Sequence, residues 1–425
     1  MKIPKIAIIG AGAAGLMCAA SLIEENTGAE IHLFEKNTIL GSKVIISGGG
    51  RCNVTTGIRD KKELLSKYTR GSQFLKSAIG KFPPEKVYEW FEKQAVPLKT
   101  EKDQRVFPVS NDGKDIVRVF EKLFQKHEVK VHYKESVQKV MKAEDNQIDL
   151  RTDQDKYLFD YVVLTTGGNA YQHTGSTGDG YSFAKNFGHT VTPLGPSLNS
   201  FMTAEEWPKS ISGLALPNAK LEAQADDGKT VKAEGPILFT HFGISGPALF
   251  ALSSHLSFSK ISNEHPIQIS ISARAEKSFQ DWDKLIHEET QRRGAQQFQT
   301  FLKKHLQNRL VELILEQLDI EGIKKNSELS KIDRERVAHL LTGHLTLNAI
   351  KRRPGDEFVT AGGIVLDEIN KKTMQSKLHS GLFFGGEIMN VDGVTGGFNL
   401  QASWATGRLA GKSIASMLNS ASPTI

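Results

Sequence analysis

The spacing of glycines near the N-terminus constrains the fold of this chain more than any other feature. The segment KIAIIGAGAAGLMCAASLIEE starts with a strand-like run at 5–9, reaches a glycine turn, and continues as a helix-forming stretch to about Glu25. A second strand-like segment, AEIHLFEK, follows at 29–36. This order predicts a β-α-β unit of about thirty residues. Such units occur in parallel sheets that helices cover.

The glycines of this turn follow the pattern G-x-G-x-x-G at Gly10, Gly12 and Gly15. The first glycine permits the tight turn, the second lets a pyrophosphate approach the backbone, and the third lets helix and strand pack closely. The N–H groups at the start of the helix then face the anion. Glu35 ends the second strand about 20 residues further on, where a carboxylate binds ribose hydroxyls. The pattern predicts a dinucleotide site that favours a ribose without a 2′-phosphate.

Further glycine motifs indicate which dinucleotide is bound. VVLTTGG places residues 166–168 at the carboxyl end of a strand, and GEIMNVDG places Glu387 and Asp392 similarly. Open α/β sheets bind ligands at this edge. GGFNLQAS puts residues 399–401 at the start of the last helix, whose partial positive charge stabilises the negative charge of a reduced flavin. Because the motifs converge from both ends of the chain, they suit FAD better than a nicotinamide cofactor bound in one half.

Changes in composition indicate how the chain is divided. After residues 192–201, the segment 203–273 alternates like strands with glycine and proline between them, and the segment 276–345 is helical and rich in charge. Residues 357–369 are again strand-like, and a helix of small residues follows at 400–418. An insertion therefore splits one α/β domain.

The predicted fold is α/β, with a parallel-sheet Rossmann FAD domain and a discontinuous insert. Residues 60–127 within the FAD domain are predicted to be mostly helical. The predicted domains are an FAD-binding domain at 1–194 and 360–425, a β-rich insert subdomain at 195–275 and 346–359, and a helical insert subdomain at 276–345.

Charge and cysteine content exclude several classes of protein. The net charge is +6, but lysine and arginine are scattered rather than grouped, which favours a small-molecule substrate over a nucleic-acid partner. The two cysteines, Cys18 and Cys52, form no C-x-x-C pair, so we expect no disulfide framework and no metal site. No run of about 18 or more apolar residues is present, so we expect a cytoplasmic protein without a membrane span.

Five longer stretches of the chain are distinctive. They read EKNTILGSKVIISGGGRCNVTT, TGGNAYQHTGSTGDGYSFAKNFGH, LFTHFGISGPAL, VTAGGIVLDEINKKTMQSK and GLFFGGEIMNVDGVTGGFNLQASWATG. They resemble the signatures of the BaiN/RdsA-like flavoproteins, a bacterial family also described as aminoacetone-oxidase-like or NAD(P)/FAD-dependent oxidoreductases. The resemblance covers nearly the whole chain. It implies a glutathione-reductase-like FAD domain with a β-rich insert that itself holds a helical piece.

The resemblance also implies which residues bind FAD non-covalently. The expected cofactor-binding residues are Gly10, Gly12, Ala13, Ala14, Gly15, Glu35, Lys36, Lys43, Ser47, Gly48, Gly49, Gly50, Arg51, Cys52, Asn53, Val137, Thr166, Gly167, Gly168, Gly386, Glu387, Gly397, Asn399, Leu400 and Gln401. The triple glycine before Arg51 would keep side chains away, so that backbone groups reach the pyrophosphate and the edge of the ring.

The catalytic residues are less clearly marked. His241 precedes a helix expected to start near Pro247, so it either faces the flavin or caps that helix. Tyr171 follows the glycine turn at 167–168, and Arg51 is a candidate partner for a phosphate or a substrate carboxylate. Cys52 has no resolving cysteine, so we do not expect a disulfide reductase. Asp179 is expected to fix a loop rather than act as a base.

These features predict an FAD-dependent oxidoreductase that transfers a hydride between the flavin and a small organic substrate. The chain has no second strand–GxGxxG–helix unit, so the flavin would be reduced either by NAD(P)H that docks transiently or directly by the substrate. A flavin amine or ketone oxidase that uses oxygen is one alternative. An RNA-associated flavoprotein of the tRNA-modifying type is another, and a protein that binds FAD without turnover is a third. The substrate and the oligomeric state stay open.

Overall fold

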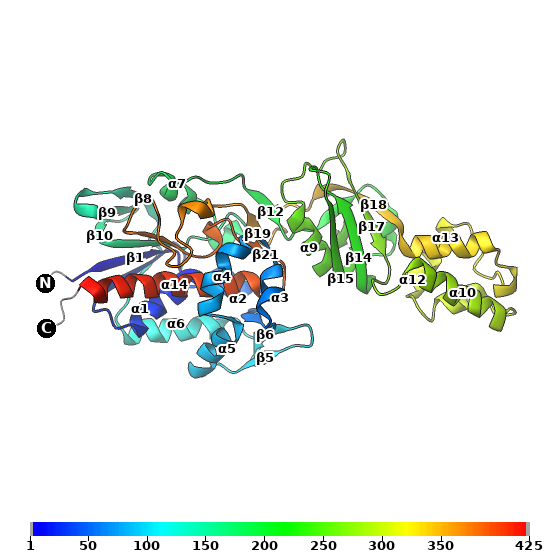
Figure 1. The fold of residues 1–425 in the computed structure, drawn as a ribbon, viewed down its shortest axis with the longest axis horizontal. Coiled ribbons are helices and arrows are strands. Elements are labelled where there is room, and N and C mark those ends of the chain that lie inside the picture. The colour runs from blue at the N-terminus through cyan, green and yellow to red at the C-terminus, as the bar shows by residue number, and fades with distance from the viewer. Residues whose placement is uncertain (1–2, 422–425) are drawn as a thin grey trace. The chain divides into compact units, whose positions relative to one another are not determined.

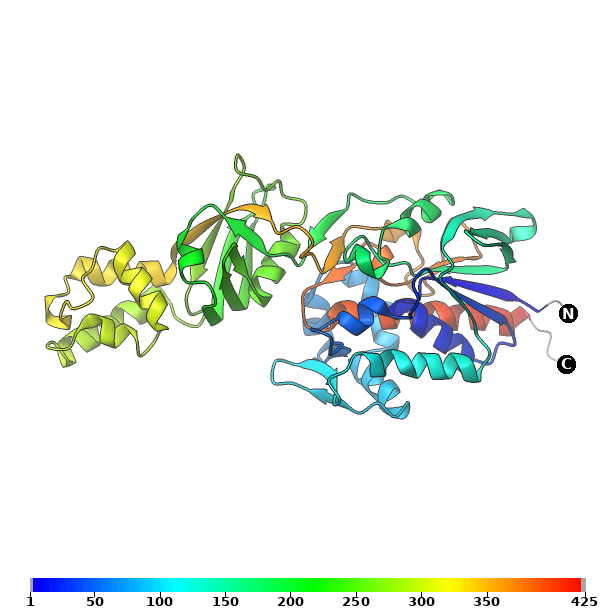
Figure 2. The ribbon, with the colours of Figure 1, turned by 180° about the vertical axis from the view of Figure 1, so that it is seen from behind.

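The computed structural model describes residues 3–421 of the 425-residue chain. The chain forms two compact units, Met1–Pro196 with Phe358–Ile425 and Ser197–Glu357. Figures 1 and 2 show the elements of both units from opposite sides. Within residues 3–421, no helix is both long and apolar enough to cross a membrane.

The first unit is built on a five-stranded parallel sheet. Its strand order is β20-β11-β1-β2-β7. These strands are β1 (Lys5–Ile9), β2 (Glu30–Glu35), β7 (Lys130–Tyr133), β11 (Tyr161–Leu164) and β20 (Leu382–Phe384). The apolar run of β1 is buried from Ile6 to Ile9, as expected for a strand that is covered on both faces. The parallel order confirms the predicted Rossmann-type α/β fold.

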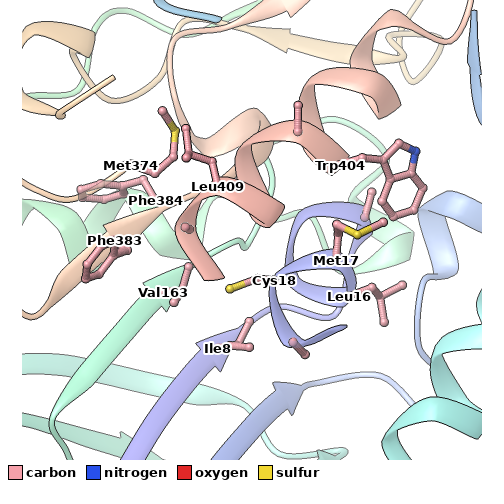
Figure 3. Packing of buried hydrophobic residues seen from close by; sticks show 14 of the residues in the cluster. Ile8, Leu16, Met17, Cys18, Val163, Met374, Phe383, Phe384, Trp404 and Leu409 are labelled. Atoms are coloured by element: carbon pink, nitrogen blue, oxygen red, sulfur yellow. The ribbon is translucent and has the colours of Figure 1, made fainter. Parts of the chain in front are cut away.

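Helices cover one face of this sheet, and a small antiparallel sheet covers the other. α1 (Ala13–Glu24), α6 (Lys114–Lys126) and α14 (Phe398–Ala421) lie on the helical face in both views (Figures 1 and 2). The sheet of β8 (Val137–Lys142), β9 (Ile148–Thr152) and β10 (Lys156–Phe159) lies on the opposite face. Figure 3 shows side chains of β1, α1, β11, β20 and α14 packed into one buried cluster, with Cys18 among them.

The remaining elements of the first unit are short. They are α2 (Ser42–Ile46), β3 (Thr55–Thr56), α3 (Lys61–Ser66), β4 (Tyr68–Arg70), α4 (Ser72–Lys81), α5 (Pro84–Lys93), β5 (Leu98–Thr100), β6 (Arg105–Pro108), η1 (Glu144–Asn146), η2 (Gln172–Thr174), α7 (Asp179–Lys185), β12 (Gly195–Ser197), β19 (Val359–Ala361), η4 (Leu366–Glu368), η5 (Gly386–Ile388) and β21 (Asp392–Gly393). Residues 60–127 are mostly helical, as predicted, but the sequence did not indicate β4, β5 and β6, which also lie there. Strands this short carry too little alternation to be distinguished from loops.

The second unit contains a closed barrel and a group of helices. The barrel order is β13-β16-β15-β14-β17-β18. The elements are β13 (Phe201–Thr203), α8 (Trp207–Ser210), β14 (Ala215–Gln224), β15 (Thr230–Thr240), β16 (Gly243–Ser245), α9 (Pro247–His255), β17 (Ile267–Ser272), α10 (Phe279–Arg292), α11 (Phe298–Leu302), α12 (Asn308–Gln317), η3 (Asn326–Glu328), α13 (Lys331–Leu341) and β18 (Thr342–Arg352). The helices between β17 and β18 fall where the sequence predicted helix. The division of the insert into two subdomains stays a prediction.

Candidate cofactor site

The turn between β1 and α1 is built by three glycines with different surroundings. Gly10 has φ +98°, and a Cβ there would lie 2.7 Å from the carbonyl oxygen of Thr165. A Cβ on Gly15 would lie 2.0 Å from the carbonyl oxygen of Gly10, so a side chain at either position would displace backbone. Gly12, the N-cap of α1, has no atom within 4 Å of its Cβ position and supplies no side-chain cap. The first N–H groups of α1 therefore have no side-chain cap, and the space beside Gly12 is open. This combination suits an anion.

Glu35 lies at the end of β2, beside this turn. Its Oε2 accepts a hydrogen bond from Ala11 N–H (3.1 Å), and its Oε1 accepts one from Asn37 N–H (2.9 Å). Burial raises the pKa of the Glu35 carboxyl, and the two backbone donors oppose that rise. The carboxylate still has acceptor capacity for ribose hydroxyls. The N–H of Glu135 donates to the Glu35 carbonyl (3.2 Å), which brings the start of β8 at Val137 to the same end of the sheet.

Lys36, the next residue, pairs with a different carboxylate. Its Nζ donates to Oδ2 of Asp179 and to Oγ1 of Thr177, both at 2.6 Å. Asp179 is the first residue of α7, so the pair ties the end of β2 to the start of that helix. This contact gives Asp179 the loop-fixing role that the sequence suggested. A contact between Lys36 and the cofactor stays a prediction.

Glu387 joins four segments that are remote in the sequence. Its Oε2 accepts from Lys43 Nζ (2.9 Å), and its Oε1 accepts from Thr360 N–H (2.8 Å). A Cβ on Gly168 would lie 2.8 Å from that Oε1 and 2.4 Å from Thr360 Oγ1, so only glycine fits there. The buried Oγ1 of Thr166 has no hydrogen-bond partner among residues 3–421. The sequence did not single out Thr360, and the glycine pair that follows β19 was its only signal.

The triple glycine forms a turn with left-handed backbone throughout. Gly48, Gly49 and Gly50 have φ values of +57°, +72° and +86°, and Cys52 has φ +58°. A Cβ on Gly48 would lie 2.9 Å from Asn53 N, whereas nothing lies within 4 Å of the Cβ positions of Gly49 and Gly50. The loop therefore needs glycine for its backbone conformation and presents open backbone at two positions. Burial raises the pKa of Cys52 to about 12, so its thiol stays protonated at neutral pH.

The two polar residues after the triple glycine are both engaged within the first unit. Arg51 Nη1 donates to Glu101 Oε1 (2.7 Å), and its guanidinium carbon lies 3.8 Å from the centre of the Phe107 ring. In its hydrogen-bonded orientation, the Asn53 amide oxygen accepts from Gly397 N–H (2.9 Å). Asn53 thus connects the glycine turn to the segment before α14. Because the charge of Arg51 is already paired, its contact with a cofactor or substrate stays a prediction.

The side chains at the start of α14 fix its position. Asn399 exchanges two hydrogen bonds of 2.8 Å with the backbone of Gly393. Gln401 is fully buried, accepts from the Thr55 hydroxyl (2.6 Å) and donates to the Phe82 carbonyl (2.8 Å). A contact between these residues and a flavin would therefore come from backbone N–H groups rather than from the amides.

The remaining catalytic candidates lie in different units. Tyr171 has φ +59°, stacks on Phe358 with ring centres 5.8 Å apart, and has Lys43 Nζ 5.8 Å from its ring centre. His241 is an exposed residue of the second unit, between β15 and β16. It does not cap α9, because the N-cap of α9 is Gly246 and no side chain caps it. A role for His241 at the flavin stays a prediction.

The predicted residues of the first unit thus fit an FAD. The open glycine at the start of α1 suits a pyrophosphate, the anchored Glu35 suits a ribose, and the open turn at 49–50 lets a flat ring approach the backbone. Hydrogen bonds and close approaches link the segments at 10–15, 35, 43, 48–53, 168, 387 and 397 into one region.

Comparison with known proteins gives the family. The model of the HI0933-like protein Rossmann domain matches residues 4–413. The chain belongs to this family. It is 26% identical over 416 residues to the 3-dehydro-bile acid delta(4,6)-reductase of Clostridium scindens. That alignment covers 97% of this chain and 99% of the reductase. It is 29% identical over 408 residues to the ribosomal RNA dihydrouridine synthase of Haemophilus influenzae, at 94% and 95% coverage.

Solved structures share the fold at low sequence identity. Mycobacterium smegmatis Sdh1 in its apo form aligns with a TM-score of 0.52 at 15% identity, covering 100% of this chain and 70% of that one. A variant of E. coli quinol fumarate reductase FrdA aligns with a TM-score of 0.51 at 15% identity, covering 100% and 72%. The family and the site together make this HI0933-like protein an FAD-dependent oxidoreductase, as the sequence predicted.

Proposed function

We propose that this oxidoreductase reduces a carbon–carbon double bond conjugated with a carbonyl group, with NAD(P)H as the electron donor. The observation that carries the proposal is the chemistry shared by the two kinds of relative. A delta(4,6)-reductase of a 3-dehydro bile acid and a dihydrouridine synthase both add hydrogen across such a bond. The addition takes one hydride and one proton, so the chain must bind a hydride carrier and hold a proton donor.

The first unit supplies the binding groups in this proposal. The start of α1 would hold the pyrophosphate, Glu35 would hold a ribose, and the open backbone of the turn at 48–50 would bind the cofactor between them and the ring. When bound, FAD supplies a two-electron carrier between NAD(P)H and the substrate. Lys43 is fixed by Glu387 and places a positive charge in the same region, which stabilises negative charge that develops during reduction.

A mutation in the glycine turn tests the cofactor site. Gly49→Val should yield protein without flavin, because valine fills an open position and resists the left-handed backbone. Gly28→Val is the matched control: Gly28 also has a positive φ and an open Cβ position, but it lies between α1 and β2, away from the proposed site. The measurement is the ratio of flavin absorbance to protein absorbance. Equal flavin loss in both variants would show that strain alone, and not the site, causes the loss.

Tyr171 is the proposed proton donor. Its left-handed backbone is rare for a bulky residue, and it is maintained here while the ring stacks on Phe358 near Lys43. Tyr171→Phe should keep the flavin and its reduction by NAD(P)H but slow substrate reduction by about 100-fold or more. Tyr161→Phe, a half-buried tyrosine on β11, is the control. Normal turnover in Tyr171→Phe would remove this assignment.

Anaerobic mixing tests the reaction itself. The FAD-loaded protein is mixed with NADH or NADPH, and the visible flavin absorbance is followed. We expect rapid bleaching by at least one nicotinamide, and rapid return of the colour when a conjugated enone is added. An amine or ketone oxidase would instead show no bleaching by either nicotinamide, bleaching by its own substrate, and peroxide formation in air.

A ribosomal RNA substrate is the second candidate. It is favoured by two relatives named ribosomal RNA dihydrouridine synthase, at 29% and 28% identity over 94% of this chain. The test incubates the holoenzyme and NAD(P)H with unmodified ribosomal RNA or with a 3-oxo-4,6-diene steroid. Mass spectrometry then measures dihydrouridine in the RNA and the reduced steroid. Reduction of the steroid alone would support the small-molecule proposal, and reduction of the RNA alone would replace it with this second candidate.

A further inference from the structure

The first unit contains a pocket that the cofactor site does not use. Its volume is about 530 Å³, and it is lined by the end of α4, by α5 and by the middle of α14. These helices are labelled in Figure 1. Gly407 and Gly411 of α14 approach the backbone of α1, whereas Ala405 and Leu409 line the pocket. The pocket therefore lies on a different side of α14 from α1, the helix that follows the nucleotide-binding turn.

The lining of this pocket is strongly basic. Five of its ten residues are cations and one is an acid. The cations are Lys81, Lys86, Lys93, Arg408 and Lys412, and the acid is Glu89. Cations gathered around a concave surface raise the local positive potential and attract anions. This cluster cannot be recognised in the sequence, because its members come from segments more than 300 residues apart.

Two of the cations are fixed by acids at the C-terminal end of α1. Arg408 Nη2 donates to Glu24 Oε2 (2.7 Å), and Lys412 Nζ donates to Glu25 Oε1 (2.7 Å). The guanidinium carbon of Arg408 lies 4.7 Å from the centre of the Phe82 ring. Arg408 Nη1 is buried and has no hydrogen-bond partner among residues 3–421. The guanidinium is thus held in place with one donor unused.

The other three cations carry charges that no carboxylate neutralises. Lys81 donates to the carbonyl oxygen of Lys372 (3.3 Å), and within residues 3–421 no ion pair involves Lys81, Lys86 or Lys93. All three are exposed at the rim. Trp90 forms part of the wall, and its indole N–H is already used by Glu24 (2.6 Å). The pocket thus combines exposed lysine charges, which form no ion pair within residues 3–421, with a guanidinium that Glu24 and Phe82 hold in place.

We propose that this pocket binds an anion that carries two or more phosphate groups. Its volume falls within the range of about 300–1,000 Å³ typical of small-molecule sites. Lysine ammonium groups bind phosphate as mobile point charges, and a fixed guanidinium binds it in a defined direction. Two sources offer this chemistry: a free nucleoside polyphosphate, and consecutive phosphates of an RNA strand. The site is separate from the flavin, so the proposal does not depend on the reaction proposed above.

Binding measurements on the FAD-loaded full chain test this proposal. The probes are inorganic triphosphate and a single-stranded uridine oligomer, each titrated by calorimetry at low and moderate salt. The double variant Lys86→Glu/Lys93→Glu should weaken binding by about tenfold or more, because it removes two charged contacts. Lys122→Glu/Lys126→Glu makes the same charge change on exposed lysines of α6 and should leave binding unchanged.

Each outcome supports or overturns the proposal. Loss of triphosphate binding only in the α5 variant supports the pocket with a free polyphosphate as its ligand. Loss of RNA binding only in that variant supports the pocket with RNA as the source. Absence of binding to both probes, or equal losses in the two variants, overturns it. Flavin reduction by NAD(P)H is measured on the same samples, so a failure here is distinguished from a failure of the proposed function.

Discussion

Gly407 sets how closely two helices from opposite ends of the chain approach each other. A Cβ at this position would lie 2.0 Å from the carbonyl oxygen of Ala14 and 2.8 Å from its carbonyl carbon. The added methyl group would meet backbone atoms of α1, so no side-chain rotation could relieve the clash. Because Ala14 lies in the first turn of α1, the same contact helps to position the turn that is proposed to hold the pyrophosphate.

Gly407→Ala should therefore destabilise the protein. Inserting a methyl group into such a contact costs about 1–3 kcal/mol of unfolding free energy. Gly80→Ala is the matched control in α4: its Cβ would meet only the flexible end of Lys61, at 3.2 Å. That change should stabilise the helix by about 0.5–1 kcal/mol. Chemical denaturation measures both, and a Gly407→Ala protein as stable as wild type would contradict the predicted clash.

At the level of single residues, the sequence predicted the positions that require glycine better than it predicted the hydrogen-bond partners of polar side chains. The glycines at 10, 15 and 168 have no space for a Cβ, as their motifs indicated. The sequence did not indicate that Arg51 bonds to Glu101 or that the Thr55 hydroxyl donates to Gln401, and the contacts of Arg51 and Gln401 with the cofactor stay predictions. A glycine motif encodes a local backbone conformation, whereas the partner of a polar side chain depends on segments that only folding brings near.

At the level of elements, periodic segments were predictable and short ones were not. The parallel strands, α1 and α14 lie close to their predicted bounds, because buried strands and long helices repeat their pattern. Residues 357–369 were expected to be strand-like, but only Val359–Ala361 is a strand. Gly362 and Gly363 follow with φ values of +91° and +146°, which end it. The closure of the barrel depends on pairing between remote strands, which no local pattern shows.

The helices of the second unit offer a test of local signals. α10 starts with a capping box: Ser278 Oγ accepts from Asp281 N–H (3.2 Å), and the Asp281 carboxylate accepts from Ser278 N–H (2.8 Å). Ser278→Ala should lower the unfolding free energy of this unit by about 1 kcal/mol. Gln297→Ala is the control, because Gln297 is the exposed N-cap of α11 and makes no side-chain cap. A loss of equal size in both variants would contradict a specific role for the box.

At the level of the whole molecule, burial of histidines makes stability depend on pH. Burial lowers the pKa of His32, His189, His305 and His379, and for His189 the hydrogen bond that its ring donates to the Glu368 carboxylate opposes that shift. The unfolded chain takes up these protons near pH 6.5, but the folded chain does so only at lower pH. The unfolding free energy should therefore be constant above about pH 7 and fall as the pH drops through 6.5.

Denaturation at pH 7.5 and 5.5 measures this dependence. His189 has a fully buried side chain that bonds to Glu368 and Ser376, so His189→Gln should reduce the difference between the two pH values. His127→Gln, at an exposed position after α6, should leave the difference unchanged. A pH dependence that is the same in wild type and His189→Gln would contradict the assignment to this residue.

The first unit has the features that a part of the chain needs in order to fold without the second unit. Buried apolar residues form two clusters, one within each unit. The residues that flank the insert are hydrogen-bonded to each other, since Thr192 N–H donates to the carbonyl of Gly363 (2.9 Å). All the predicted cofactor-binding residues belong to the first unit. The first unit therefore has its own core and contains the whole proposed FAD site. The two places where the chain leaves and re-enters this unit are joined by a hydrogen bond.

Replacing residues 197–357 by a short glycine–serine linker should thus give a folded protein that still binds FAD. The two ends to be joined lie close together, so a flexible linker closes the gap at small entropic cost. Flavin absorbance per protein should match that of the full chain, and circular dichroism should show cooperative unfolding. The same deletion carrying Gly49→Val should be folded but colourless, which distinguishes the proposed site from adventitious binding. A deletion protein that unfolds cooperatively and yet is colourless without that substitution would show that the insert is needed to hold the cofactor.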